Sequence, residues 1–200
     1  MYAYIEGEVA EITEKTAVID NHGIGYEIFM PSRDLGAMVH DEEIRVFTYY
    51  HSNENGTALY GFLTKEEKRL FTLLIGVNGV GPKGALSILS VLSAEDLTYA
   101  IIGENAKAIQ AAQGIGAKAA QKIILELKDK LDLKEAVENT LSKGASESAS
   151  VGSMKNNVLL GLSALGFSNA DAIRALNSVE ITEDATEESL LKEALKQLTR

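Results

Sequence analysis

The sequence predicts a multidomain α+β protein with a small β-barrel first, an all-helical domain in the middle and a small helical bundle at the end. Five short runs rich in Val, Ile, Tyr and Phe lie in the first 63 residues. The apolar period then changes from strand to helix at Thr64, which marks a change of structural class. A stretch of Ser, Gly and Ala near residues 139–153 separates a last helical segment from the rest. The predicted domains are therefore residues 1–63, 64–142 and 153–200, with a flexible linker at 143–152.

Composition places the chain among folded, soluble proteins. It has 200 residues, of which 46% are hydrophobic and 24% charged, as in globular domains. The absence of cysteine excludes disulfides, thiolate zinc sites and a cysteine nucleophile, and suits a reducing cytoplasm. Acidic residues occupy the start where a signal peptide is apolar, and no apolar run approaches the roughly 20 residues that span a bilayer. We expect a cytoplasmic protein with no membrane partner.

The formal net charge of −10 argues against a nucleic-acid partner only if it is spread evenly. The charge is unevenly distributed. Residues 1–62 hold eleven acidic and three basic side chains, whereas residues 63–138 hold ten of each. The middle of the chain can therefore present local positive charge.

The first segment is predicted to form a five-stranded barrel. Its strand-like runs are "YAYIEGEVAEI", "TAVIDN", "IGYEIFM", "IRVFTYYH" and "TALYGFL". Turn signals separate them at His22-Gly23, Pro31-Ser32 and Asn55-Gly56. A barrel of five strands in about 60 residues is typical of the OB type, which often binds nucleic acid, although an SH3-like barrel has a similar strand count.

The middle and last segments are predicted to be helical. Thr64 and Glu67 have the spacing of a capping box, and Ser93 begins a second helix in the same way. An amphipathic stripe is formed by Ala120, Ile123, Ile124, Leu127 and Leu131. After the linker, "NNVLLGLSALGF", "NADAIRALN" and "EESLLKEALKQL" predict a three-helix bundle with Leu165, Phe167 and Ile173 in its core.

Two glycine-rich segments, "NGVGPKGA" and "QGIGAKAA", are the candidates for a phosphate-binding site. Both satisfy the dinucleotide fingerprint by letter, but that fingerprint needs a preceding strand, and here a helical segment precedes each copy. A P-loop is excluded because Pro82 stands where the phosphate-binding lysine belongs. We therefore expect no nucleotide hydrolysis, no catalytic residue and no cofactor.

Each turn instead has the pattern of a helix-hairpin-helix motif, with a lysine two places after its second glycine. Glycine lets the backbone approach a ligand, and the first amides of the next helix, with its dipole, favour an anion. Pro82 fits the first position of that helix, where its missing amide is not needed. The alternative is that the glycines only make tight turns. The residues predicted to bind DNA backbone are Gly79, Val80, Gly81, Lys83, Gly84, Gly114, Ile115, Gly116, Lys118 and Lys122.

Along its whole length the chain resembles the RuvA family of Holliday-junction branch-migration proteins. The motifs that carry the resemblance are the opening "MYAYIEGEV", the strand "GIGYEI", "LYGF" running into "TKEEKRLF", and the pair "NGVGPKGA" and "QGIGAKAAQKIILELKDK". The three helical segments after a linker complete it.

The resemblance implies sequence-independent binding of four-way DNA junctions, which a homotetramer, or two of them, holds open and flat. It implies that residues 153–200 recruit the hexameric ATPase RuvB, with the RuvC resolvase as a further partner to consider. The family also places an acidic pin of two adjacent acids at the tetramer centre. Here that pair falls on Glu54 and Asn55, so only one position is charged.

Two other functions stay open on residues alone. A DNA glycosylase also has a helix-hairpin-helix motif followed by a catalytic aspartate, and Asp96 follows the first turn; the simpler interpretation is that Asp96 completes the cap at Ser93. A generic scaffold with tandem hairpins is the second alternative. The three histidines, His22, His40 and His51, lack metal-ligand spacing, so no metal site is predicted.

Overall fold

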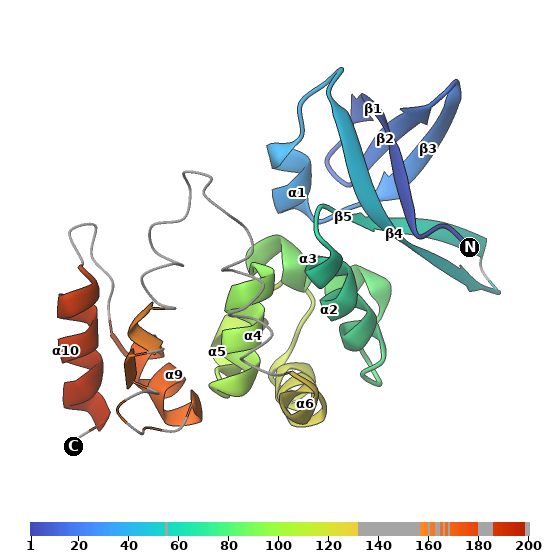
Figure 1. Cartoon of the computed structure of the whole chain (residues 1–200). Coiled ribbons are helices and arrows are strands. Elements are labelled where there is room, and N and C mark those ends of the chain that lie inside the picture. The colour runs from blue at the N-terminus through green and yellow to red at the C-terminus, as the bar shows by residue number, and fades with distance from the viewer. Residues whose placement is uncertain are drawn as a thin grey trace. The chain divides into compact units, whose positions relative to one another are not determined.

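Figure 1 shows the computed structural model of the chain. Its residues divide into two compact units. The first unit contains residues 1–94 and 111–116, and the second contains residues 95–110 and 117–200. The structure describes residues 1–54, 56–131, 157–159, 161, 162, 165, 167, 169–179 and 186–198. The linker predicted at 143–152 lies outside them.

Five strands in the first unit close into a barrel. They are β1 (Tyr4–Ile12), β2 (Thr16–Asn21), β3 (Ile24–Phe29), β4 (Glu43–Asn53) and β5 (Gly56–Phe62). Their order around the barrel is β1-β2-β3-β5-β4, with β3 and β5 parallel and the other pairs antiparallel. The predicted five-stranded barrel is confirmed, and a closed barrel leaves no long free edge.

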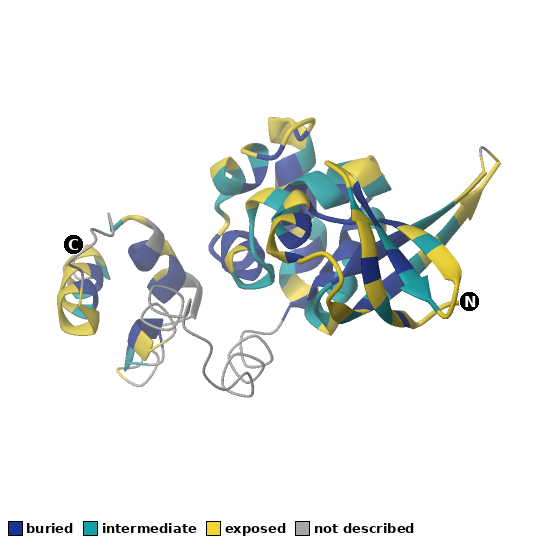
Figure 2. Cartoon of the chain, turned by 90° about the horizontal axis from the view of Figure 1, so that it is seen from above, coloured by how far each residue is buried: buried dark blue, intermediate teal, exposed yellow. Residues whose placement is uncertain are grey.

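The barrel core follows from strand alternation. Ile5, Val9, Ile19, Ile28 and Val46 are buried, and Figure 2 shows buried and exposed residues alternating along the strands. The turn predicted at His22-Gly23 is present, with both residues at positive φ (53° and 86°) as a tight hairpin requires.

One prediction for this unit is wrong. Pro31-Ser32 predicts a turn, but Pro31 precedes a short helix, α1 (Ser32–Ala37), which connects β3 to β4. Its burial is limited to Asp34 and Leu35, so the segment shows no helical apolar period to detect. Proline fits this place because it does not need to donate to the helix ladder.

Two helices complete the main part of the first unit. Helix α2 (Lys65–Ile75) has the predicted capping box: the Glu67 amide donates to Thr64 Oγ1 at 3.1 Å, and the Thr64 amide donates to Glu67 Oε2 at 3.1 Å. The ring of Phe71 packs against Phe62 of β5 with 4.9 Å between centroids, which anchors α2 to the barrel. Helix α3 (Pro82–Val91) has Pro82 in its first turn.

The second unit is helical. It contains most of α4 (Ala94–Ile102), then α5 (Ala106–Gln110), α6 (Ala117–Leu127), a 3-10 turn at Lys128–Lys130, α9 (Asn169–Asn177) and α10 (Glu187–Leu198). The predicted stripe is confirmed, since all five of its members are buried. Ile173 is buried as predicted, but Leu165 is 60% exposed and is not a core residue.

Among the described residues, no single helix is long and apolar enough to span a membrane; α3 and α4 meet the length and composition only as a pair bent by 100°.

Candidate nucleic-acid interface

The first glycine turn joins α2 to α3 and is closed by one hydrogen bond. The Val80 amide donates to the Val77 carbonyl at 2.9 Å. Both of these side chains are buried, at 5% and 2% exposure, so the turn is fixed to the core by its apolar residues. Gly79 between them has φ +94°, a conformation that L side chains rarely adopt.

The second turn, between α5 and α6, repeats this geometry position by position. The Ile115 amide donates to the Ala112 carbonyl at 3.2 Å, and both side chains are buried. Gly114 has φ +84°. Two segments 35 residues apart thus adopt the same turn with the same pattern of buried and exposed residues.

The predicted glycines divide into three groups by what a side chain would meet. Gly79 and Gly114 require positive φ. Gly81 and Gly116 face open space, since a Cβ built on either meets no atom within 4 Å. Gly84 is a packing residue, because its Cβ would lie 3.2 Å from Ile115 Cδ1 of the second turn. A Cβ built on Gly79 or Gly114 also meets no atom within 4 Å, so the backbone is open to close approach by a ligand at all four of these glycines and is covered at Gly84.

The backbone amides of the two turns are of two kinds, those that close the turn and those that begin the next helix. The amides of Val80 and Ile115 are used to close the turns. The helices that follow begin at Pro82 and Ala117, and the first amides of a helix have no partner within it. The amides at the start of α3 and α6 can therefore receive a phosphate, and the helix dipole also favours an anion there.

Polar side chains are exposed beside the buried apolar residues of the turns. Lys83 and Lys118 are exposed in the first turns of α3 and α6. Lys122 is partly engaged by Glu126, with 3.8 Å between Nζ and Oε1. Sequence reasoning overlooked Asn78 and Gln113, which are exposed beside the positive-φ glycines and carry amide donors. Aligning the two turns on their glycines would have found this pair.

The pin position lies on the β4–β5 hairpin of the barrel. Glu54 is exposed at its turn, and Asn55 lies outside the described residues. Gly56, which the sequence places in a turn with Asn55, is instead the first residue of β5 and pairs with Asn53 of β4.

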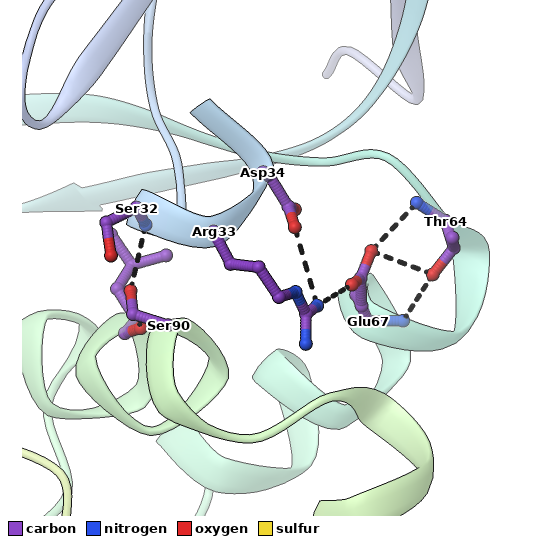
Figure 3. A network of polar contacts seen from close by, with 7 residues as sticks. Ser32, Arg33, Asp34, Thr64, Glu67 and Ser90 are labelled. Carbon is purple, nitrogen blue, oxygen red and sulfur yellow. Dashed lines mark hydrogen bonds and ion pairs between the residues drawn. The ribbon is translucent and has the colours of Figure 1, made fainter. Parts of the chain in front are cut away.

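A partly buried polar network, which the sequence analysis did not predict, links the helices on either side of the first turn to α1 of the barrel unit (Figure 3). Arg33 of α1 forms ion pairs with Asp34 and with Glu67 of α2, and the Ser32 amide donates to Ser90 Oγ of α3 at 2.9 Å. Asp34 is 3% exposed, and its Oδ2 is a buried atom with no hydrogen-bond partner. Burial, and next the negative charge of Glu67, raises the pKa of the Asp34 carboxyl from 3.8 to about 6.

Two alternatives raised by the sequence can be compared with the described residues: an aspartate placed as in a glycosylase, and a metal site. Asp96, the residue that a glycosylase would use, lies exposed in the first turn of α4. A negative charge at this end of a helix interacts favourably with the helix dipole. Among the residues that the structure describes, no group of three or more acidic or histidine side chains could hold a metal ion.

A closed five-stranded barrel followed by two equivalent glycine turns defines the class of tandem helix-hairpin-helix proteins with an N-terminal barrel. Family models agree along the chain. Residues 1–61 match the RuvA N terminal domain, residues 71–129 the SAM-like helix-hairpin-helix tandem, and residues 154–199 the RuvA C-terminal domain.

Three full-length relatives carry the same name. The chain is 42% identical over 206 residues to the Holliday junction branch migration complex subunit RuvA of Lachnospira eligens, 39% over 202 residues to that of Acetivibrio thermocellus, and 40% over 203 residues to that of Clostridium perfringens. Each match covers 100% of both chains. The chain belongs to the RuvA family.

Proposed function

We propose that this protein binds four-way DNA junctions through their phosphate backbone, without reading sequence, as a non-catalytic subunit of a branch-migration complex. The observation that carries the proposal is the pair of equivalent turns, each presenting an open glycine, the amides of a helix start and an exposed lysine. None of these groups recognises a particular base, so affinity depends on phosphate and on salt. The relatives named as RuvA support the junction as the substrate.

The proposed assembly follows from what one chain offers. Two turns grip one duplex arm, so a homotetramer grips the four arms of a junction. Residues 1–63 form the centre, residues 64–142 hold the arms and residues 153–200 recruit RuvB through the linker at 143–152. The acidic barrel surface keeps duplex away from places where it is not held.

The decisive test uses the open glycines. Gly81→Ala and Gly116→Ala add one methyl group in open space, so the folded protein accommodates it while a phosphate held against the backbone does not. We expect unchanged unfolding temperatures and weaker binding, by roughly tenfold, to a synthetic four-way junction and to duplexes of unrelated sequence.

Gly36→Ala is the matched control. Gly36 also faces open space, but it lies in α1 and is part of neither turn, so binding should not change. If Gly81→Ala and Gly116→Ala bind junctions as the parent does, the turns are structural only and the proposal fails.

The role of the tail is tested by truncation. A chain ending at Gly144 should still assemble and bind junctions, but should no longer stimulate the ATPase of RuvB. Loss of junction binding in this truncated chain would contradict the proposed division of roles.

A further inference from the structure

Gly84 lies at the place where the two glycine turns meet. It is the third residue of α3 (Pro82–Val91). A Cβ built on Gly84 would lie 3.2 Å from Ile115 Cδ1 of the second turn and 3.9 Å from Val80 Cγ1 of the first. All three residues belong to the first compact unit. The residues whose amides close the two turns thus converge on a position that has no side chain.

The space that Gly84 leaves is used by Ile115. A separation of 3.2 Å is shorter than the ordinary contact of about 3.5–4.0 Å between carbon atoms, so a methyl group at position 84 would push the Ile115 side chain away. Two other reasons for a glycine do not apply. Gly84 lacks the positive φ of Gly79 and Gly114, and glycine is a poor helix former. The room left for Ile115 is therefore what favours glycine here.

Ile115 connects this contact to the part of the second turn that faces a ligand. Its side chain is buried, and its amide donates to the Ala112 carbonyl at 3.2 Å. It lies directly between Gly114 and Gly116, whose backbones are both open. A shift of Ile115 therefore moves both open glycines of the second turn relative to the first turn.

We propose that Gly84 sets the spacing between the two turns, so that both hold phosphates of one duplex at the same time. The inference rests on the proposed function and adds a positioning residue to it. Two linked binding sites reinforce each other only when their spacing lets both engage together. A side chain at position 84 leaves each turn closed by its own hydrogen bond and changes the distance between the two. Gly84 thus acts on DNA through Ile115 and not by touching phosphate.

Gly84→Ala in the full-length chain tests the proposal. This variant should bind a duplex of mixed sequence more weakly, by roughly three- to tenfold, because the two turns no longer fit it together. The midpoint of urea unfolding should not fall, because alanine is the better helix former. Gly36→Ala adds the same methyl group to α1, which is part of neither turn, and should bind as the parent does.

A rescue variant removes the atom that the new methyl group would meet. Valine lacks Cδ1, so Gly84→Ala made in an Ile115→Val chain should leave the affinity of that chain unchanged. Valine and alanine are also the residues that the chain has at the equivalent positions of the other copy, Val80 and Ala119.

A second pair of variants separates spacing from a local defect in the first turn. Gly116→Ala removes the proposed grip of the second turn. Gly84→Ala added to the Gly116→Ala chain should then cause no further loss, because a single gripping turn has no spacing to keep. A further loss in that chain would overturn the inference.

The inference is also overturned if Gly84→Ala binds duplex as the parent does while Gly116→Ala binds it weakly, or if the loss persists in the Ile115→Val chain. A loss of binding that comes with a parallel fall in unfolding stability has the same meaning, since Gly84 then serves packing alone. Normal binding by Gly116→Ala contradicts the proposed function instead, so the two failures can be told apart.

Discussion

The two glycine turns have the same conformation but different surroundings. Gly79 and Gly114 share a positive φ, and each turn is closed by a hydrogen bond between equivalent residues. The first turn follows an eleven-residue helix with a capping box and precedes Pro82, whereas the second follows the five-residue α5 and precedes Ala117. The turn conformation is therefore set locally, by the glycine and the buried apolar residues beside it, and the flanking helices only hold it in place.

The difference lies in how each turn is fastened. The helices of the first are tied to the barrel by Arg33 and Ser90. The second is seated by the contact of Ile115 with Gly84. A change at the turn itself should thus act alike in both copies, and a change in the barrel network should act on the first copy.

The largest effect is expected from Gly79→Val and Gly114→Val. A β-branched residue at positive φ costs about 1–3 kcal/mol, so each variant should lose stability by that amount in urea unfolding. Each should also bind junction and duplex at least roughly tenfold more weakly, because the following helix start is displaced. Equal losses would support the equivalence of the turns.

A loss of stability without a loss of binding in Gly114→Val would break that equivalence, because the second turn would then be structural. Gly81→Ala and Gly116→Ala serve as the comparison, since they leave φ unstrained and the core untouched.

A smaller effect, confined to the first turn's support, is expected from Asp34→Asn. The folded pKa of about 6 lies above the ordinary 3.8, so the folded state binds a proton that the unfolded state releases between these values. The stability that this proton confers is complete below about pH 4 and is lost as the pH rises to about 6. Asp34→Asn should therefore be more stable than the parent by about 1–2 kcal/mol at pH 7.5 and nearly equal to it at pH 4.

Urea unfolding at both pH values gives this measurement, with Glu27→Gln as a control at an exposed carboxylate. A difference between Asp34→Asn and the parent that does not vary with pH would show that Asp34 ionises as an ordinary carboxylate.

The polar network around Arg33 and Asp34 could not be predicted from the sequence, whereas several other features could. Strand alternation, the Thr64–Glu67 capping box and the helical stripe are periodic or local signals, and each predicts its element correctly. The turns are detectable because glycine spacing reports backbone conformation. The short α1 has no periodic signal, and the pairing of Arg33 with Glu67, 34 residues away, depends on packing.

Within the turns, the sequence does not separate the glycines by role. Gly81 and Gly84 look alike in the motif, but one faces open space and the other packs on Ile115 from 31 residues further along the chain. The prediction for Leu165 fails for a similar reason. Its apolar side chain predicts a core position, but the residue is exposed in the structure.

The next effect in size tests whether the two lysines act alike. Lys83→Ala and Lys118→Ala should each flatten the log-log dependence of binding on salt by about 0.9 for each phosphate that the variant no longer neutralises. The measurement is duplex affinity across a salt series. An unchanged slope for one variant would assign phosphate binding to the lysine of the other turn, and unchanged slopes for both would leave the lysines without a role in binding.

The smallest effect is expected at a third tight turn, the β4–β5 connection, which should repel phosphate where the glycine turns attract it. Glu54 is exposed there, so its interaction with nearby phosphates is screened and amounts to about 1 kcal/mol or less. Glu54→Gln should raise junction affinity, and Asn55→Asp, which restores the family's acidic pair, should lower it. Both shifts should shrink near 1 M salt, where screening limits the repulsion to about 3 Å.

Binding to a four-way junction and to plain duplex at two salt concentrations separates the outcomes, because a residue at the crossover affects the junction alone. Equal shifts on both DNAs would place Glu54 away from the crossover and remove the contrast between this turn and the other two.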